Sequence, residues 1–309
     1  MTELTYSDIE AAAARISGRV RPVTVAPADK DGHVFALEFM QHTGTFKARG
    51  AQNFIQAHLV EGTFPEAGVT IASGGNAGLA CAWAARAADV PATVFLPTTA
   101  PSVKVERLRS YGARVELVGS EFAEAAAACQ EFVDSSGALA SHAYDHPLIA
   151  AGAGTLMTDI LTQVPALDTV VVSVGGGGLF AGVATAATHH GVRTVAVEPE
   201  NCRALSAAIE AGEPVDVTVD SVAADSLGAR RATPLALNAA RSDLVTSVLV
   251  SDDAIIGARQ HLWDQHRLAV EHAAATALAG AHGSGGYAPA EGEKVCVVLC
   301  GANTSLGDL

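Results

Sequence analysis

The stretch that decides the fold reads Gln41-His42-Thr43-Gly44-Thr45-Phe46-Lys47-Ala48-Arg49-Gly50. A small polar turn precedes a lysine and residues that favour a helix, which predicts a loop leading into a helix with the threonine oxygens as caps. Lys47 would lie in the first turns, where the helix macrodipole disfavours a cation. Because a neutral amine is the form that attacks a carbonyl carbon, Lys47 is a candidate nucleophile. An ordinary surface lysine is the alternative, which this stretch alone does not exclude.

Outward from this stretch, apolar runs alternate with helical patterns. The runs that predict strands lie at 34–38, 69–73, 92–96, 114–118, 169–174, 194–198, 244–250 and 294–300. The helical patterns lie at 5–17, 79–88, 102–111, 122–133, from 179 onward, 252–267 and 271–281. Strands this apolar are typical of parallel sheets covered on both faces, so we expect an α/β fold with two parallel sheets. We expect a large domain formed by 1–50 and 144–309, with a small domain, 51–143, inserted in it.

The composition restricts the classes of partner. A net charge of -14 with only 19 Lys and Arg among 309 residues argues against nucleic acid and anionic membranes, so a small-molecule substrate is expected. Five cysteines without CxxC spacing indicate neither a disulfide framework nor a zinc cluster. The chain starts without the pattern of a secretory signal and has no apolar run of the ~20 residues that a membrane span needs. These features favour a cytoplasmic protein.

Two glycine-rich loops each join a predicted strand to a helix. Gly175-Gly176-Gly177-Gly178 suits a phosphate, because the backbone can approach the anion and the helix dipole favours negative charge. Ser73-Gly74-Gly75-Asn76-Ala77-Gly78 is a second anion cradle that would suit a carboxylate. Each loop could instead be a simple turn, with Asn76 as a helix cap. Cys300 ends the last predicted strand, and ligands of open α/β sheets gather beyond the carboxyl ends of strands.

A dinucleotide site is another interpretation of the first loop. Gly176, Gly178 and Ala181 fit the pattern G-x-G-x-x-A, and Glu198 ends the next strand at about the ~20-residue interval of a ribose-binding acid. An NAD-binding oxidoreductase is therefore a rival hypothesis. Against it, the motif lies in mid-chain after a complete α/β unit, and Lys47 and the Asn76 loop would have no role.

A lysine, two anion cradles and a neutral polar group at a strand end are the parts needed to hold pyridoxal phosphate (PLP) against an amino acid. The chain resembles the fold-type-II PLP enzymes, whose fold is like that of tryptophan synthase β, along nearly its whole length. It is most similar to the serine/threonine dehydratases. The motifs that carry the resemblance are residues 43–51, 73–78 and 175–179 and Cys300-Gly301, in the order that the family has them.

The resemblance implies a role for each residue. Lys47 forms the Schiff base and removes the α-proton, Phe46 packs beside the ring, Asn76 binds its 3-hydroxyl, and Cys300 meets the pyridine nitrogen. The phosphate is expected on Gly175, Gly176, Gly177, Gly178 and Leu179. The substrate carboxylate is expected on Ser73, Gly74, Asn76 and Ala77. The implied reaction is elimination of water from L-threonine or L-serine, giving a 2-oxo acid and ammonia.

Departures from related enzymes separate the alternatives. Serine racemases of this fold need a serine directly after the position of Ser73, where this chain has Gly74, so dehydration is preferred. Bulkier β-hydroxy amino acids, such as phenylserine, remain open. Glu198-Pro199 is followed by Cys202 and Ala204 where relatives place further cation ligands, so no metal site is predicted. The resemblance also implies a homodimer. Because only nine residues follow Cys300, we expect no regulatory domain after the last strand, as in the short dehydratases.

Two further expectations concern charged residues. Lys104, Glu106, Arg107 and Arg109 are expected on a solvated helix face, and Glu271 is expected to face the cofactor.

Overall fold

The computed structural model describes residues 3–29, 32–283, 285–305 and 307. It contains two sheets built mainly from parallel strands, as the apolar runs predict. The expected α/β class is therefore confirmed. No helix in the described part of the chain is long and apolar enough to cross a membrane.

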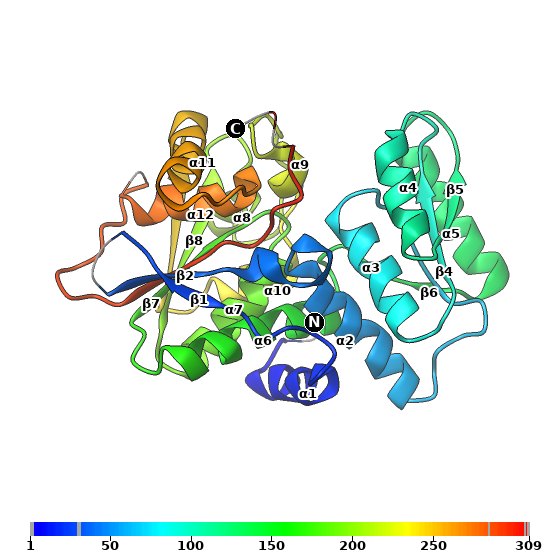
Figure 1. Cartoon of the computed structure of the whole chain (residues 1–309), viewed down its shortest axis with the longest axis horizontal. Coiled ribbons are helices and arrows are strands. Elements are labelled where there is room, and N and C mark those ends of the chain that lie inside the picture. Colours follow the sequence, from blue (N-terminus) through cyan, green and yellow to red (C-terminus); the bar gives the residue numbers. More distant parts are fainter. Residues whose placement is uncertain (1–2, 30–31, 284, 306, 308–309) are drawn as a thin grey trace.

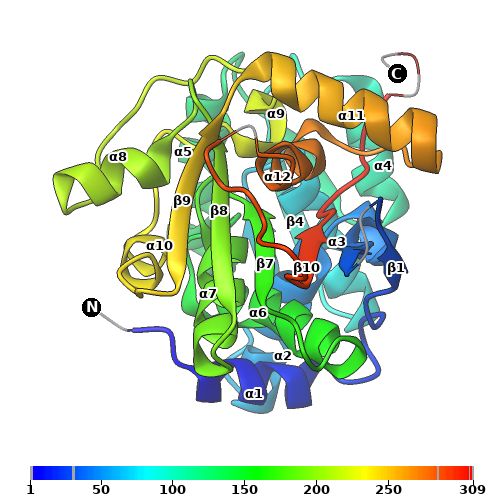
Figure 2. The same ribbon diagram turned by 90° about the vertical axis from the view of Figure 1, so that its left-hand side faces the viewer.

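The larger sheet has six strands, of which only the edge pair β1/β2 is antiparallel. Its spatial order is β1 (Val25–Pro27), β2 (His33–Ala36), β10 (Val295–Val298), β7 (Thr169–Ser173), β8 (Arg193–Pro199) and β9 (Val245–Val250). Figure 2 shows β10, β7, β8 and β9 side by side. The central strands are buried along almost their whole length, which explains their continuous apolar sequences.

The smaller sheet has four parallel strands. Its order is β5 (Arg114–Leu117), β4 (Ala92–Leu96), β3 (Val69–Ile71) and β6 (Leu139–Ala140). Figure 1 shows this sheet with its helices beside the larger one. The exact limits of the small domain stay a prediction, because one helix, α2, crosses the expected boundary at residue 50.

Helices cover both sheets. The α-helices of the described residues are α1 (Tyr6–Ile16), α2 (Lys47–Val60), α3 (Asn76–Ala87), α4 (Ser102–Ser110), α5 (Phe122–Ser136), α6 (Pro147–Gln163), α7 (Gly178–His189), α8 (Ala204–Ala211), α9 (Ala224–Leu227), α10 (Pro234–Ala239), α11 (Asp252–His266) and α12 (His272–Ala281). Both α7 and α12 pack against β7 and β8, in the core of the larger sheet. Two short 3-10 helices, Glu38–Met40 and His42–Gly44, precede α2.

A buried ionic cluster fixes α2 in place. Arg49 is only 1% exposed, and its Nε and Nη2 donate to the two carboxylate oxygens of Glu38 at 2.7 and 3.1 Å. Its Nη2 also donates to Asp159 Oδ2 at 2.8 Å, and its Nη1 to Thr155 Oγ1 at 3.1 Å, both on α6. Because a buried charge needs such partners, the cluster ties α2 to α6 and to the turn at residue 38. The first residue of α2, Lys47, is positioned by this arrangement.

Candidate active site

A cavity of about 660 Å³ lies where elements of the two sheets meet. All the residues that the sequence proposes for the site line it: Phe46, Lys47, Ser73, Gly74, Asn76, Ala77, Gly175, Gly176, Gly177, Gly178, Leu179 and Cys300. They come from the starts of α2, α3 and α7 and from the end of the chain after β10. The fold thus gathers helix N-termini and strand ends around one space, the usual position for a ligand in an open α/β sheet.

Lys47 is the first residue of α2 and is half-buried. Its Nζ donates to the backbone oxygen of Ala143 at 2.8 Å and lies 4.7 Å from the centre of the Phe46 ring. Burial lowers the pKa of Lys47 to about 8, although Cys300 and Glu271 partly oppose this shift. A far larger fraction of this amine than of an ordinary lysine is therefore neutral near physiological pH, and the neutral form is the nucleophile.

The turn before Lys47 differs from the expected threonine caps. Phe46 is the N-cap residue of α2 and makes no side-chain capping bond, so the expectation that threonine oxygens cap this helix is wrong. The hydroxyl oxygens of Thr43 and Thr45 are buried without a hydrogen-bond partner. Thr43 has a φ of 65°, a region that β-branched residues rarely adopt. The turn is held instead by the segment after β10, since Phe46 N donates to Cys300 O at 3.0 Å.

The glycine loop before α7 has no room for side chains. A Cβ added to Gly176 would lie 2.3 Å from the ring of Tyr144, and Gly177 has a φ of 98°. The loop leads directly into α7, whose first amide groups have no partner within the helix. Close backbone approach and free amides are the features of an anion cradle.

The asparagine loop, residues 73–78, leads into α3 in a similar way. The side chain of Asn76 in this loop already makes hydrogen bonds. Asn76 Nδ2 donates to both carboxylate oxygens of Glu271, at 2.9 and 3.1 Å. The side-chain Nδ2 of Asn303 donates to Asn76 Oδ1 at 2.7 Å, and the backbone N–H of Asn303 donates to Glu271 Oε1 at 2.9 Å. Burial raises the pKa of Glu271, while the hydrogen bonds from Asn76 and Asn303 act against that rise. These contacts fix the orientation of the Asn76 amide toward the cavity.

Cys300 lies beyond the end of β10 and is 3% exposed. Its Sγ is 3.7 Å from Ser173 Oγ, at the end of β7. Burial, reinforced by the nearby Glu271, raises the pKa of Cys300 to about 12. The cavity is therefore lined here by a neutral thiol.

Several cavity residues escaped the sequence analysis. Tyr144 and Asn303 lie in loops whose long-range contacts leave no local pattern, although both line the cavity. Lys104 and Arg107 are exposed, as expected for a solvated helix face, and they also line the cavity. Arg107 Nη2 donates to Asn303 Oδ1 at 2.7 Å, so two lining residues from distant segments are in contact.

Glu198 does not act as the dinucleotide hypothesis requires. Its carboxylate is buried and accepts hydrogen bonds from the amides of Leu205 and Ser206 at 2.7 and 2.8 Å, in the first turn of α8. Burial raises the pKa of Glu198 to about 7 despite these bonds. The acid thus stabilises a helix start and is absent from the described lining of the cavity.

Comparison with known proteins identifies the family. Residues 20–301 match the family model described as pyridoxal-phosphate dependent enzyme. The chain belongs to this family. Its cofactor is PLP, and the half-buried amine, the anion cradle and the neutral thiol described above fit that group. The NAD-binding hypothesis is thereby excluded.

Individual relatives cover most of the chain. It is 37% identical to an L-threonine ammonia-lyase of Geobacter sulfurreducens over 79% of this chain, but spans only 61% of that protein's length. It is 38% identical to a phenylserine dehydratase of Ralstonia pickettii, over 87% of this chain and 82% of the relative. The solved structure of maize serine racemase superposes with a TM-score of 0.89 at 29% identity, covering 99% of this chain and 95% of the other.

Proposed function

We propose that this protein is a PLP-dependent lyase that removes water from L-threonine or L-serine and releases a 2-oxo acid and ammonia. The observation that carries the proposal is the Lys47 amine, with its pKa lowered to about 8, inside a cavity that two helix N-termini enter. The threonine ammonia-lyase and phenylserine dehydratase relatives support elimination as the reaction.

Each part of the cavity has a proposed task. When bound, PLP supplies an electron sink for the negative charge that develops at the substrate α-carbon. The neutral Lys47 amine would hold the cofactor at its carbonyl carbon and would take the α-proton of the substrate. The backbone amides from Gly175 to Leu179, in the loop before α7 and at its start, would hold the phosphate, and Phe46 would pack beside the ring.

The substrate side is formed by the start of α3. We propose that Ser73 Oγ and the backbone N–H groups of Gly74, Asn76 and Ala77 bind the substrate carboxylate. The side-chain carboxamide of Asn76 would bind the 3-hydroxyl of the cofactor. The neutral Cys300 thiol would leave the pyridine nitrogen without a strong negative partner. A weaker electron sink favours direct loss of the β-hydroxyl over long-lived carbanions.

Gly74 bears on the choice between elimination and racemisation. Racemisation needs a proton donor on the second face of the substrate, and glycine has no side chain to supply it. A Cβ added to Gly74 would lie 2.9 Å from Leu96 Cδ2, so this position is also crowded on one side. We therefore place elimination before racemisation.

We also infer a cytoplasmic homodimer. The five cysteines are all free and buried, which suits a reducing compartment. Homodimerisation rests on the family resemblance, and light scattering of the purified protein tests it.

The decisive experiment is product analysis with L-threonine, L-serine and phenylserine. We expect equal amounts of 2-oxo acid and ammonia from at least one of them, and no activity in Lys47→Ala. Lys294→Ala, at an exposed position outside the described cavity lining, is the matched control and should retain wild-type activity. Formation of D-amino acid without 2-oxo acid would overturn the proposal in favour of a racemase.

A further inference from the structure

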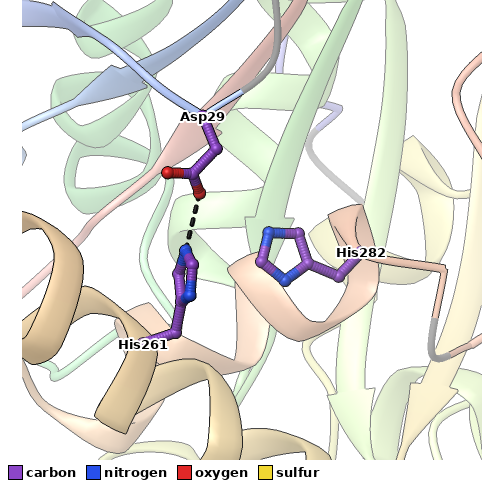
Figure 3. Close-up of side chains that lie close together, drawn as sticks. All are labelled: Asp29, His261 and His282. Atoms are coloured by element: carbon purple, nitrogen blue, oxygen red, sulfur yellow. Dashed lines mark hydrogen bonds and ion pairs between the residues drawn. The ribbon is translucent and has the colours of Figure 1, made fainter.

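Three side chains from distant segments of the chain lie close together beside the larger sheet, near β1, α11 and the end of α12. Asp29 follows β1, His261 lies on α11, and His282 directly follows α12 (Figure 3). One carboxylate oxygen and two imidazole nitrogens of this triad all lie within 4.8 Å of one another. His261 Nε2 is 2.7 Å from Asp29 Oδ2, and the rings of His261 and His282 meet nearly at right angles with centroids 5.4 Å apart.

The spacing is close to that of a metal site. Zinc–ligand bonds of about 2.0–2.1 Å in tetrahedral geometry place neighbouring ligand atoms roughly 3.4 Å apart. In the triad, His261 Nε2 and Asp29 Oδ2 are 2.7 Å apart, closer than this value, and the separations between the three ligand atoms are all within 4.8 Å. Small side-chain rotations would equalise them, and the side chains of Asp29 and His261 are 35% and 34% exposed, so they can move and an ion can reach them.

The chemistry of the donors selects the kind of ion. Two imidazole nitrogens and one carboxylate oxygen suit Zn²⁺ and similar transition metals, whereas Ca²⁺ and Mg²⁺ prefer oxygen ligands throughout. Three protein ligands leave a fourth position for water.

A fourth residue orients the carboxylate. His266 Nε2 lies 2.8 Å from Asp29 Oδ1, the oxygen that does not contact His261. The His266 ring packs edge-on against Phe35, with centroids 5.1 Å apart. Ligating carboxylates in metal sites are commonly held by such an outer hydrogen bond. The arrangement therefore contains an orienting residue as well as three ligands.

We propose that Asp29, His261 and His282 bind one Zn²⁺ ion, with His266 as the residue that positions Asp29. The ion would join the edge strand pair β1/β2 to α11 and to the end of α12. Glu271 precedes α12 and His282 follows it, so about 15 Å of helix separates the metal from the candidate active site. The ion therefore stabilises the fold and takes no part in the proposed reaction.

The test uses the PLP-loaded protein after removal of metals with a chelator. Calorimetric titration with ZnCl₂ should show one ion bound per chain, and excess zinc at about a hundred times Kd should raise Tm by roughly 4 °C. His282→Ala should abolish both effects, because it removes one of the three proposed ligands. It leaves the hydrogen bond between Asp29 and His261 in place. His266→Ala should weaken binding by about 10–100-fold.

Two controls keep the outcome clear. His190→Ala changes an exposed histidine at the end of α7 and should bind zinc like the wild type. The circular dichroism spectrum of metal-free His282→Ala should match that of the metal-free wild type, which shows that the variant folds. Zinc binding that is unchanged in His282→Ala, or a wild-type Tm that does not respond to zinc, would overturn the proposal and leave Asp29 as a hydrogen-bonding partner of two histidines.

Discussion

The lowered pKa of Lys47 predicts how fast the cofactor-free enzyme takes up PLP at each pH. With a pKa of about 8, about 9% of the amine is neutral at pH 7, against roughly 0.04% for an ordinary lysine near 10.4. The uptake rate should therefore exceed that of a free lysine analogue by about two orders of magnitude at pH 7. Protonation below pH 8 removes the nucleophile, so the rate should fall there and level off above it.

Stopped-flow absorbance of cofactor uptake between about pH 6 and pH 10 measures this profile. Glu271→Gln should move its midpoint to lower pH, because the Glu271 carboxylate raises the pKa of Lys47. Glu291→Gln, at an exposed position, is the matched control and should leave the midpoint unchanged. A midpoint near pH 10 in the wild type, or an upward shift in Glu271→Gln, would refute the reasoning.

Substitutions at Arg49, Gly176 and Cys300 test other parts of the account. Arg49→Met should lower the free energy of unfolding by about 3–5 kcal/mol, because Glu38 would keep a buried charge without its main partner. In urea denaturation, Arg231→Met at an exposed ion pair should cost less than about 1 kcal/mol, and equal losses would contradict the role of burial. Gly176→Ala should weaken PLP binding by about 10–100-fold, because its methyl group would lie 2.3 Å from a tyrosine ring, and an unchanged Kd in a fluorescence titration would disprove this. Cys300→Ser should keep most lyase activity while Cys300→Asp loses most of it, and equal kcat values would exclude a role for the neutral thiol.

Local patterns predicted the parts of the fold that are buried uniformly or amphipathic. Strands such as β7 and β8 are enclosed on both faces, so their sequences are continuous apolar runs. The helix α6 escaped prediction because it is buried on nearly every side and lacks a polar face. The strand β6 has only two residues, too few for a recognisable alternation.

The parts of the candidate site that lie at strand ends and helix starts were predictable from the order of strands and helices in the sequence. Lys47 and Cys300 follow from strand ends and helix starts that a parallel sheet places together. Asn303 was not predictable, because its hydrogen bonds to Asn76 and to the Thr43 backbone join residues far apart in sequence. The threonine caps failed because Thr43 adopts a positive φ and buries its hydroxyl in the turn.

The visible absorption spectrum of the purified protein, before and after addition of L-threonine, tests the central claim most directly. If Lys47 holds PLP, the wild type should show a yellow absorption band that shifts with the amino acid, and Lys47→Ala should lose the wild-type band. A wild-type protein that stays colourless after PLP is supplied, or a Lys47→Ala variant with the wild-type spectrum and response, would contradict the claim.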